Sequence, residues 1–407
     1  SPTGEAAAQQ VVSALRQQFG ATARILVVAS DQPGDPEFAI AVERQLKASG
    51  AQVLETVRGE PKDARDALMR IMAAGGKLDA VACSQAAGNW LVLASLKTDF
   101  PALGDPQLVT PHKYRWPNFL KPENLLNIAN QIAVIAIVAI GMTMVIITGG
   151  IDLSVGSLLA LSAVLTASLI RDFAGGVNAT FHGMVLACLA AILVCGMIGG
   201  FSGLMITRFA IPPFIVTLAM MLVGSGLAYI LAEGQSVYQI PDSFVWLGRG
   251  ADLMSLPNAV VLMLLLYGLA HVLMSRMKLG RYLYAVGGNS EAARLSGVPV
   301  PRVLMFAYIA SALLAGLGGV IMASQLKSGS ATYGNMYELY VIAAVVVGGT
   351  SLSGGEGKML GTLIGAFIIA VIQNGMNLTN VESYKQKVVL GLVILGAVLL
   401  DRIRHRR

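Results

Sequence analysis

The sequence predicts an α-helical polytopic membrane protein of about nine spans that carries an N-terminal α/β Rossmann-like lobe. Of its 407 residues, 55% are hydrophobic and 13% are charged, and the mean hydropathy is +0.67. Soluble domains carry about 25% charged residues. Long apolar runs follow residue 126, whereas earlier residues alternate strand and helix patterns. We therefore expect a lobe at residues 1–112, an interfacial linker at 113–126 and a transmembrane domain at 127–407.

The lobe is expected to contain a parallel sheet, because its strand patterns alternate with helix patterns. The predicted strands are residues 24–29, 52–57, 80–83 and 107–110. The predicted helices are residues 36–49, 62–74 and 88–97. An α/β lobe of this length can bury a core of its own.

Nine apolar runs after the linker are the candidate spans, since a bilayer core needs about 20 helical residues. They are residues 127–148, 149–170, 183–206, 211–232, 258–275, 303–325, 337–349, 359–376 and 386–400. The chain then ends in a basic tail, residues 401–407, and basic segments stay on the cytoplasmic side. An odd number of spans consequently places the lobe outside the cytoplasm.

A polar island between two of the apolar runs also faces the cytoplasm, because it is rich in basic residues. These residues are Arg276, Lys278, Arg281, Arg294 and Arg302. Within the island, residues 289–295 carry a short helix signal that Gly297 and Pro299 end. An ordinary basic loop would explain the charges but not this helix. A short helix between two spans is suited to docking a cytoplasmic partner.

Two glycine-interrupted motifs of the membrane domain resemble each other. Residues 147–157 and 346–355 each follow one apolar helix and precede another. With the motifs counted as five spans apart, an odd offset, their helices are expected to run in opposite senses, as in an inverted repeat. Paired interruptions predict a substrate path, although single glycines also serve close helix packing. The residues that we assign to the path are Asp152, Ser154, Ser157, Thr350, Ser351 and Ser353.

Asp152 is the acidic residue within such an interrupted apolar stretch. A carboxylate at the bilayer centre costs about 2.5–3.5 kcal/mol on insertion scales, so it indicates a functional role by default. A structural alternative is that Asp152 accepts backbone N–H groups at the start of the next helix. Both interpretations stay open, because a capped break can also line a path.

ATP binding by this chain is not expected, despite two suggestive motifs. Residues 352–356 resemble an ATPase signature, and Gly357-Lys358 resembles the end of a phosphate loop. However, Leu352 occupies the place of the required glycine, and Met359 follows the lysine. The three cysteines and four histidines are scattered, so we predict no metal site, cofactor or catalytic residue. The basic residues flank spans, which excludes a nucleic-acid partner.

From about Pro117 onward the chain resembles the permease of bacterial ribose-type ABC importers. The motifs are residues 117–119, 124–128, 150–157, 280–289, 295–297 and 343–352. The resemblance implies a permease homodimer among the lipids of the bacterial inner membrane, a separate ABC ATPase subunit and a periplasmic sugar-binding protein. Such permeases usually have ten spans, and here the lobe stands in place of the first. The resemblance assigns ATPase coupling to Gly288, Asn289, Glu291, Ala292, Ala293, Arg294, Ser296 and Gly297.

The lobe resembles the C-terminal lobe of type I sugar-binding proteins in residues 23–29, 50–53 and 78–82. A sugar cleft needs two lobes, and the Asn-Asp pair that the family carries after the third strand is Ser84-Gln85 here. We therefore expect a periplasmic docking or remnant role for the lobe, without a sugar site of its own.

The function expected on this basis is the membrane-spanning permease of an ATP-driven monosaccharide importer, with no enzymatic activity of its own. The alternative is an ion- or proton-coupled secondary transporter with an extracellular domain, which would need no ATPase. Few ionisable residues lie within the apolar runs, and this disfavours the alternative. A signalling receptor is a third hypothesis, but we identify no cytoplasmic output domain in the sequence.

Overall fold

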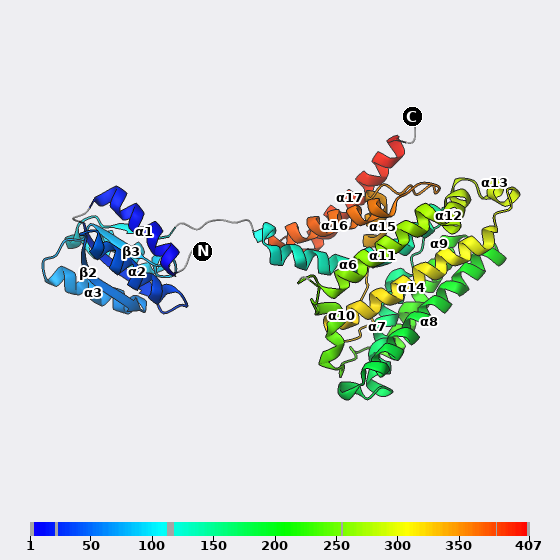
Figure 1. Ribbon diagram of the computed structural model, residues 1–407, viewed down its shortest axis with the longest axis horizontal. Helices are drawn as coiled ribbons and strands as arrows, with labels where there is room; N and C mark the ends of the chain where they lie inside the picture. The colour runs from blue at the N-terminus through cyan, green and yellow to red at the C-terminus, as the bar shows by residue number, and fades with distance from the viewer. Residues whose placement is uncertain (1–3, 21–22, 112–117, 254, 380, 405–407) are drawn as a thin grey trace. The chain divides into compact units, whose positions relative to one another are not determined.

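The computed structural model describes residues 4–20, 23–111, 118–253, 255–379 and 381–404. The chain divides into two compact units, Ser1–Trp116 and Pro117–Arg407. The first is an α/β unit and the second is helical (Figure 1).

The first unit contains a four-stranded sheet of order β2-β1-β3-β4, in which all neighbouring strands are parallel. The strands are β1 (Arg24–Ser30), β2 (Gln52–Gly59), β3 (Ala80–Cys83) and β4 (Gln107–Val109). The helices are α1 (Gly4–Phe19), α2 (Asp35–Ala48), α3 (Pro61–Ala73), α4 (Leu91–Ala94) and α5 (Leu96–Asp99). The predicted parallel sheet is confirmed, and α1 is an element that the strand and helix patterns did not reveal.

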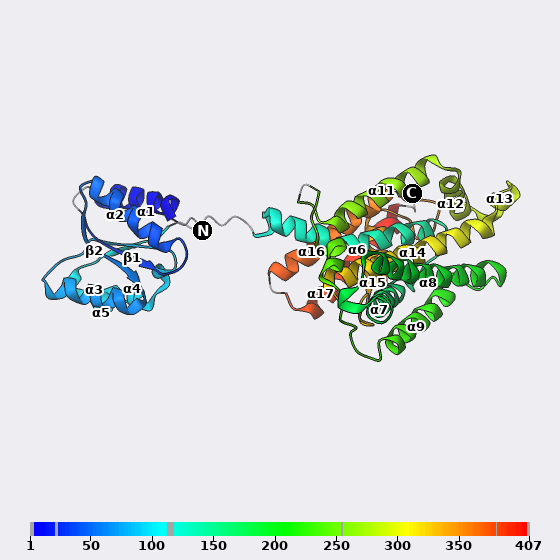
Figure 2. The same ribbon diagram turned by 60° about the horizontal axis from the view of Figure 1, so that its bottom comes forward.

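Helices cover both faces of this sheet (Figure 2). On one face, Val11 and Leu15 of α1 join Phe38 and Val42 of α2 in a buried cluster. On the other face, α3, α4 and α5 bury a second cluster that includes Leu68. Two buried layers around one sheet give this small unit a core of its own.

The second unit is built from long apolar helices with short connecting helices between them. The long helices are α6 (Pro122–Ile147), α7 (Val155–Asp172), α8 (Phe181–Arg208), α9 (Pro213–Leu231), α11 (Asn258–Arg276), α14 (Val300–Leu326), α16 (Met359–Leu378) and α17 (Ser383–Arg404). The short ones are α10 (Trp246–Arg249), α12 (Lys278–Gly288), α13 (Ser290–Leu295) and α15 (Tyr337–Val347).

Seven helices are long and apolar enough to cross a membrane, within the part of the chain that the structure describes. They are α6, α7, α8, α9, α11, α14 and α16. All nine predicted spans are helical, but α15 has 11 residues and α17 is not among the seven. At 1.5 Å per residue, α15 is about 16 Å long, roughly half the thickness of a bilayer core.

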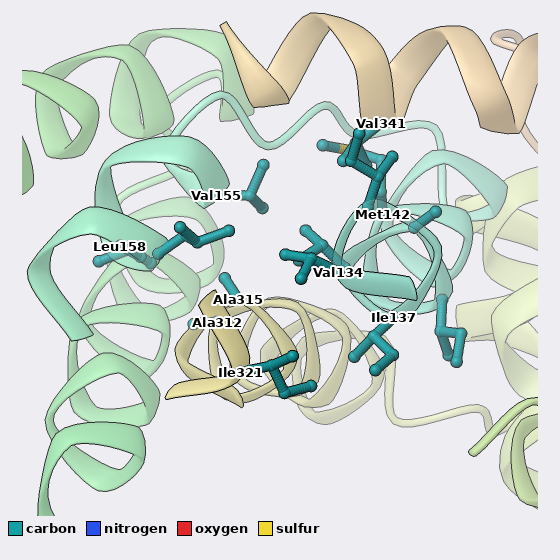
Figure 3. Packing of buried hydrophobic residues seen from close by; sticks show 14 of the residues in the cluster. Val134, Ile137, Met142, Val155, Leu158, Ala312, Ala315, Ile321 and Val341 are labelled. Carbon is teal, nitrogen blue, oxygen red and sulfur yellow. The ribbon is translucent and has the colours of Figure 1, made fainter. Parts of the chain in front are cut away.

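Helix α14 lies at the centre of the helical unit and packs against α6, α7 and α8. Figure 3 shows Ala312, Ala315 and Ile321 of α14 among buried side chains of α6 and α7. Glycines allow this close approach: a Cβ on Gly199 of α8 would meet the Tyr308 carbonyl of α14. Small residues at helix interfaces are the usual means of tight packing in membranes.

Polar side chains fasten α6 to α16 near both ends of the two helices. Asn124 and Asn374 exchange side-chain amide hydrogen bonds of 3.0 and 3.1 Å. Near the opposite ends, the hydroxyls of Thr143 and Thr362 lie 2.8 Å apart. Hydrogen bonds between helices are an established source of membrane-protein stability.

The expected opposite sense of the helices before the two glycine motifs is wrong. Helices α6 and α15 pack against each other, and Figure 3 draws Val341 of α15 beside Met142 of α6. Helix α16 runs antiparallel to α6, because Asn124 pairs with Asn374 and Thr143 with Thr362. Helix α15 in turn runs antiparallel to α16, because Gly348 adjoins Gly361 and Ala344 adjoins Gly365. The helices therefore run in the same sense. Six helical segments, not five, separate the motifs in the predicted order, and this even offset gives the two helices the same sense.

Candidate functional site

Both glycine motifs end their helices in the same way. Gly149 (φ 80°) and Gly349 (φ 85°) adopt the left-handed conformation that glycine allows at a helix end. The following amides reach back, from Gly150 N to Val145 O and from Thr350 N to Val345 O, each at 3.1 Å. This is the Schellman pattern of helix termination. The similarity that the sequence indicated is thus a shared backbone geometry.

The two motifs meet at one point, where a third glycine segment joins them. Gly355 N donates a 2.8 Å hydrogen bond to Ile147 O. Gly287, near the end of α12, lies so close that a Cβ there would overlap the Ile147 carbonyl and the Gly355 amide. The glycines that suggested nucleotide motifs therefore serve close packing between backbone segments.

The polar island comprises the last residue of α11, helices α12 and α13, and the first turn of α14, and its five basic residues are all exposed. The short helix is confirmed: the Asn289 side chain accepts the Ala292 amide at 2.9 Å, and Gly297 follows with φ +82°. Exposed Glu291 and Arg294 pair with each other, and Leu295 is 78% exposed. The Arg294 guanidinium lowers the pKa of Glu291. Among the predicted coupling residues, Ala293 is buried, whereas Gly288, Ala292, Ser296 and Gly297 are exposed.

Asp152 is almost completely buried, and both of its carboxylate oxygens accept hydrogen bonds. Its Oδ1 accepts from the Ser154 amide at 3.0 Å and from the Ser154 hydroxyl at 2.6 Å. Its Oδ2 accepts from the Ser311 hydroxyl of α14 at 2.8 Å. The carboxylate therefore ties the break between α6 and α7 to the central helix. This geometry favours the structural interpretation, although the contacts differ from a standard helix cap.

The other predicted path residues divide between the two motifs. Thr350 and Ser351 are buried beside the second break, and Ser353 is exposed there. Ser154 is buried with Asp152, whereas Ser157 lines a cavity. Of these six residues, only Ser157 lines a cavity in the part of the chain that the structure describes.

This cavity, of about 260 Å³, lies between the start of α7, the middle of α9 and the segment that leads into α15. Much of its lining is polar, and we call it the polar cavity. The polar lining residues are Ser157, Ser225, Tyr229, Thr332, Tyr333, Asn335 and Glu338. Gly156 and Gly334 allow the walls to approach, because a Cβ on either would overlap the other wall.

Sequence reasoning missed most of this lining. Residues 331–336 form turns before a half-length helix, and such segments are tolerated at membrane depth where they line a cavity. The available signal was the shortness of the apolar run that contains α15, which marks discontinuous helices in transporters. Among the described residues, no group of His, Cys, Asp and Glu side chains could hold a metal ion.

Comparison with known proteins addresses the helical unit. Residues 124–398 match the family model described as branched-chain amino acid transport system / permease component. The chain belongs to this permease family. It is accordingly a transporter subunit and not an enzyme.

Individual relatives are similar to this chain over most of its length. The ribose import permease protein RbsC of Bacillus subtilis (strain 168) is 45% identical over 288 residues, which are 70% of this chain and 87% of the relative. A probable ABC transporter permease of Sinorhizobium fredii (strain NBRC 101917 / NGR234) is 39% identical over 298 residues, covering 73% and 85%. The D-allose permease AlsC of Escherichia coli (strain K12) is 35% identical over 285 residues, covering 70% and 85%. No solved structure matches the chain.

Proposed function

We propose that this permease carries monosaccharides of the ribose type into the cell as part of an ATP-driven importer. The observation that carries the proposal is 45% identity to a ribose import permease along 87% of that protein. The family description names amino acids, but the relatives just given that have a named substrate are for ribose and allose. The hydroxyl and amide groups around the polar cavity suit a neutral polyhydroxylated substrate.

The partners proposed are a separate ABC ATPase, a periplasmic sugar-binding protein and a second copy of the permease among inner-membrane lipids. The exposed helix α13 supports ATPase docking, because it offers Glu291 and Leu295 on a rigid, capped element. The preceding helix, α12, contacts both glycine motifs through Gly287, and this supports transmission of ATPase movement to the substrate path. The coupling residues proposed from the sequence are retained in this role.

The test is uptake of radiolabelled ribose by proteoliposomes that contain the permease with its ATPase and binding protein. We expect uptake that requires ATP on the side of the membrane that carries the ATPase. Vanadate should stop this uptake, and a protonophore should not affect it. Uptake that follows the membrane gradient without the ATPase would instead support the secondary-transporter alternative. Failure to move any monosaccharide would refute the substrate class.

For orientation, we propose that residues 1–112 form a periplasmic lobe, joined through residues 113–126 to a membrane domain whose C-terminus is cytoplasmic. The exposed basic island supports this topology. A cysteine replacing exposed Ala48 should react with an impermeant thiol reagent on intact spheroplasts. A cysteine replacing exposed Ala292 should react only after lysis. The reverse pattern would invert the topology.

For the lobe, we propose a type I binding-protein-like fold that does not bind sugar by itself. Its parallel sheet with helices on both faces supports the fold, and a single unit offers only one wall of a cleft. Calorimetry of the isolated lobe with ribose, xylose, galactose and glucose should show no binding tighter than millimolar. A micromolar dissociation constant would mean that the lobe is a receptor in its own right.

A further inference from the structure

A carboxylate that the sequence motifs do not include faces the polar cavity. Glu338 is the second residue of α15, is half-buried and lines the cavity. Its carboxylate reaches across to the first turn of α7, since a Cβ on Gly156 would overlap its Oε2 atom. Two helix N-termini thus adjoin this carboxylate, and both favour negative charge.

Glu338 differs from Asp152 in what its oxygens do. Both oxygens of Asp152 accept hydrogen bonds from protein hydroxyls. For Glu338, the described residues provide no ion pair and no side-chain hydrogen bond. Apart from a hydrogen bond from its own backbone amide, the acceptor capacity of Glu338 is directed to the cavity, whereas that of Asp152 is used for contacts with Ser154 and Ser311.

We propose that the polar cavity is a binding site on the transport path and that Glu338 is its specificity-determining residue, accepting hydrogen bonds from adjacent hydroxyls of a neutral sugar ring. This inference rests on the proposed function. A carboxyl group has two oxygens and can accept several hydrogen bonds at once. Tyr229, Thr332 and Asn335 line the same space and complete a polar surface for the remaining hydroxyls.

The depth of the site fits a path through the membrane. Helix α15 has only 11 residues. Glu338 lies near its start, and its other end leads into the glycine motif that contacts the island. At 1.5 Å per residue, this distance is about half of a bilayer core. Discontinuous helices with N-termini at mid-membrane are a recurrent way to build transporter sites.

The test compares Glu338→Gln with Glu123→Gln in the reconstituted full transporter. Glu123 is a matched control, since it is also the second residue of its helix but is exposed on α6. We measure uptake of ribose and of 2-deoxyribose with one binding protein throughout, so that its selectivity cancels between variants. E338Q should lower ribose uptake about tenfold and reduce the ribose preference, whereas E123Q should match the wild type. Glu338→Asp, which keeps the charge, should recover part of both.

The outcomes separate this inference from the proposed function. If the wild type moves no monosaccharide, the proposed function fails and this inference with it. If the wild type moves ribose and E338Q retains its rate and preference, only the role of Glu338 is refuted. If E338Q and E338D both fail to co-purify with the ATPase, Glu338 is structural and the inference is likewise refuted.

Discussion

The amide of Gly355 donates a 2.8 Å hydrogen bond to the carbonyl of Ile147 and so joins the two glycine breaks of the permease. The α12 segment packs on this bond through Gly287. Because Gly287 contacts both glycine motifs, a movement of the island would displace them directly. In the proposed importer, this contact connects ATPase docking with the path.

Gly287→Ala should uncouple transport, because its Cβ would overlap the Ile147 carbonyl and force the segments apart at a cost of about 1–3 kcal/mol. Ribose uptake and sugar-stimulated ATP hydrolysis of the reconstituted transporter provide the measurement, and both should fall. Gly268→Ala is the control, since Gly268 is also a helical residue, on α11, and a Cβ there meets no described atom within 4 Å. Equal activity of the two variants would show that the contact is unimportant.

Asp152→Ala should destabilise the permease, because it leaves buried donors without acceptors. The Ser154 and Ser311 groups would lose their partner, at about 1–3 kcal/mol for each unsatisfied group. The unfolding temperature of the detergent-purified protein should fall more for D152A than for Ser311→Ala. The second substitution removes the hydroxyl itself and so leaves no donor unsatisfied at residue 311. A stable D152A variant with impaired uptake would instead make Asp152 a path residue.

Glu291→Lys should weaken capture of the ATPase, because it reverses a charge on the exposed face of α13. Co-purification of the ATPase with the tagged permease measures this. Glu382→Lys is the control: Glu382 also pairs with a basic residue three positions later, Lys385, and is exposed. Full co-purification with E291K would place the docking surface elsewhere.

Asp79→Asn should destabilise the lobe at neutral pH but not at low pH. Hydrogen bonding to Arg24 lowers the pKa of Asp79. The stabilisation is therefore complete above the unfolded pKa, about 3.9, and is lost as the pH falls through the lower folded pKa. Melting of the isolated lobe should show a lower midpoint for D79N at pH 7 and convergence with the wild type once the pH lies below the folded pKa of Asp79. Asp31→Asn, at an exposed loop residue, should leave the midpoint unchanged at both pH values.

Much of the fold could be predicted because hydropathy and turn residues act locally. Residues 80–83 form a strand as expected, and α13 begins and ends where its capping Asn289 and Gly297 indicated. Helix α1 was missed although Ala7, Val11 and Leu15 recur at helical spacing and are buried. This helix precedes the first strand, so the strand–helix alternation from which the lobe was predicted does not require it.

The site was harder to predict, because it depends on which segments meet. Asp152 attracted attention as a charge in an apolar stretch, but only the approach of Ser311 from α14 explains it. Glu338 lies at the start of the predicted span 337–349, and nothing in that apolar pattern indicates that this end faces a cavity. Its contact with Gly156 joins residues far apart in the sequence.

The two polar clasps between α6 and α16, Asn124 with Asn374 and Thr143 with Thr362, have a mechanical implication. Helices that are secured near both ends move as one rigid strut. Helix α15 packs against α16 through glycines, but among the described residues no side-chain hydrogen bond joins it to α6 or α16, and it begins beside the polar cavity. During a cycle of ATP hydrolysis, spin labels on α6 and α16 should keep a constant separation, while a label at the start of α15 should change its distance from the strut.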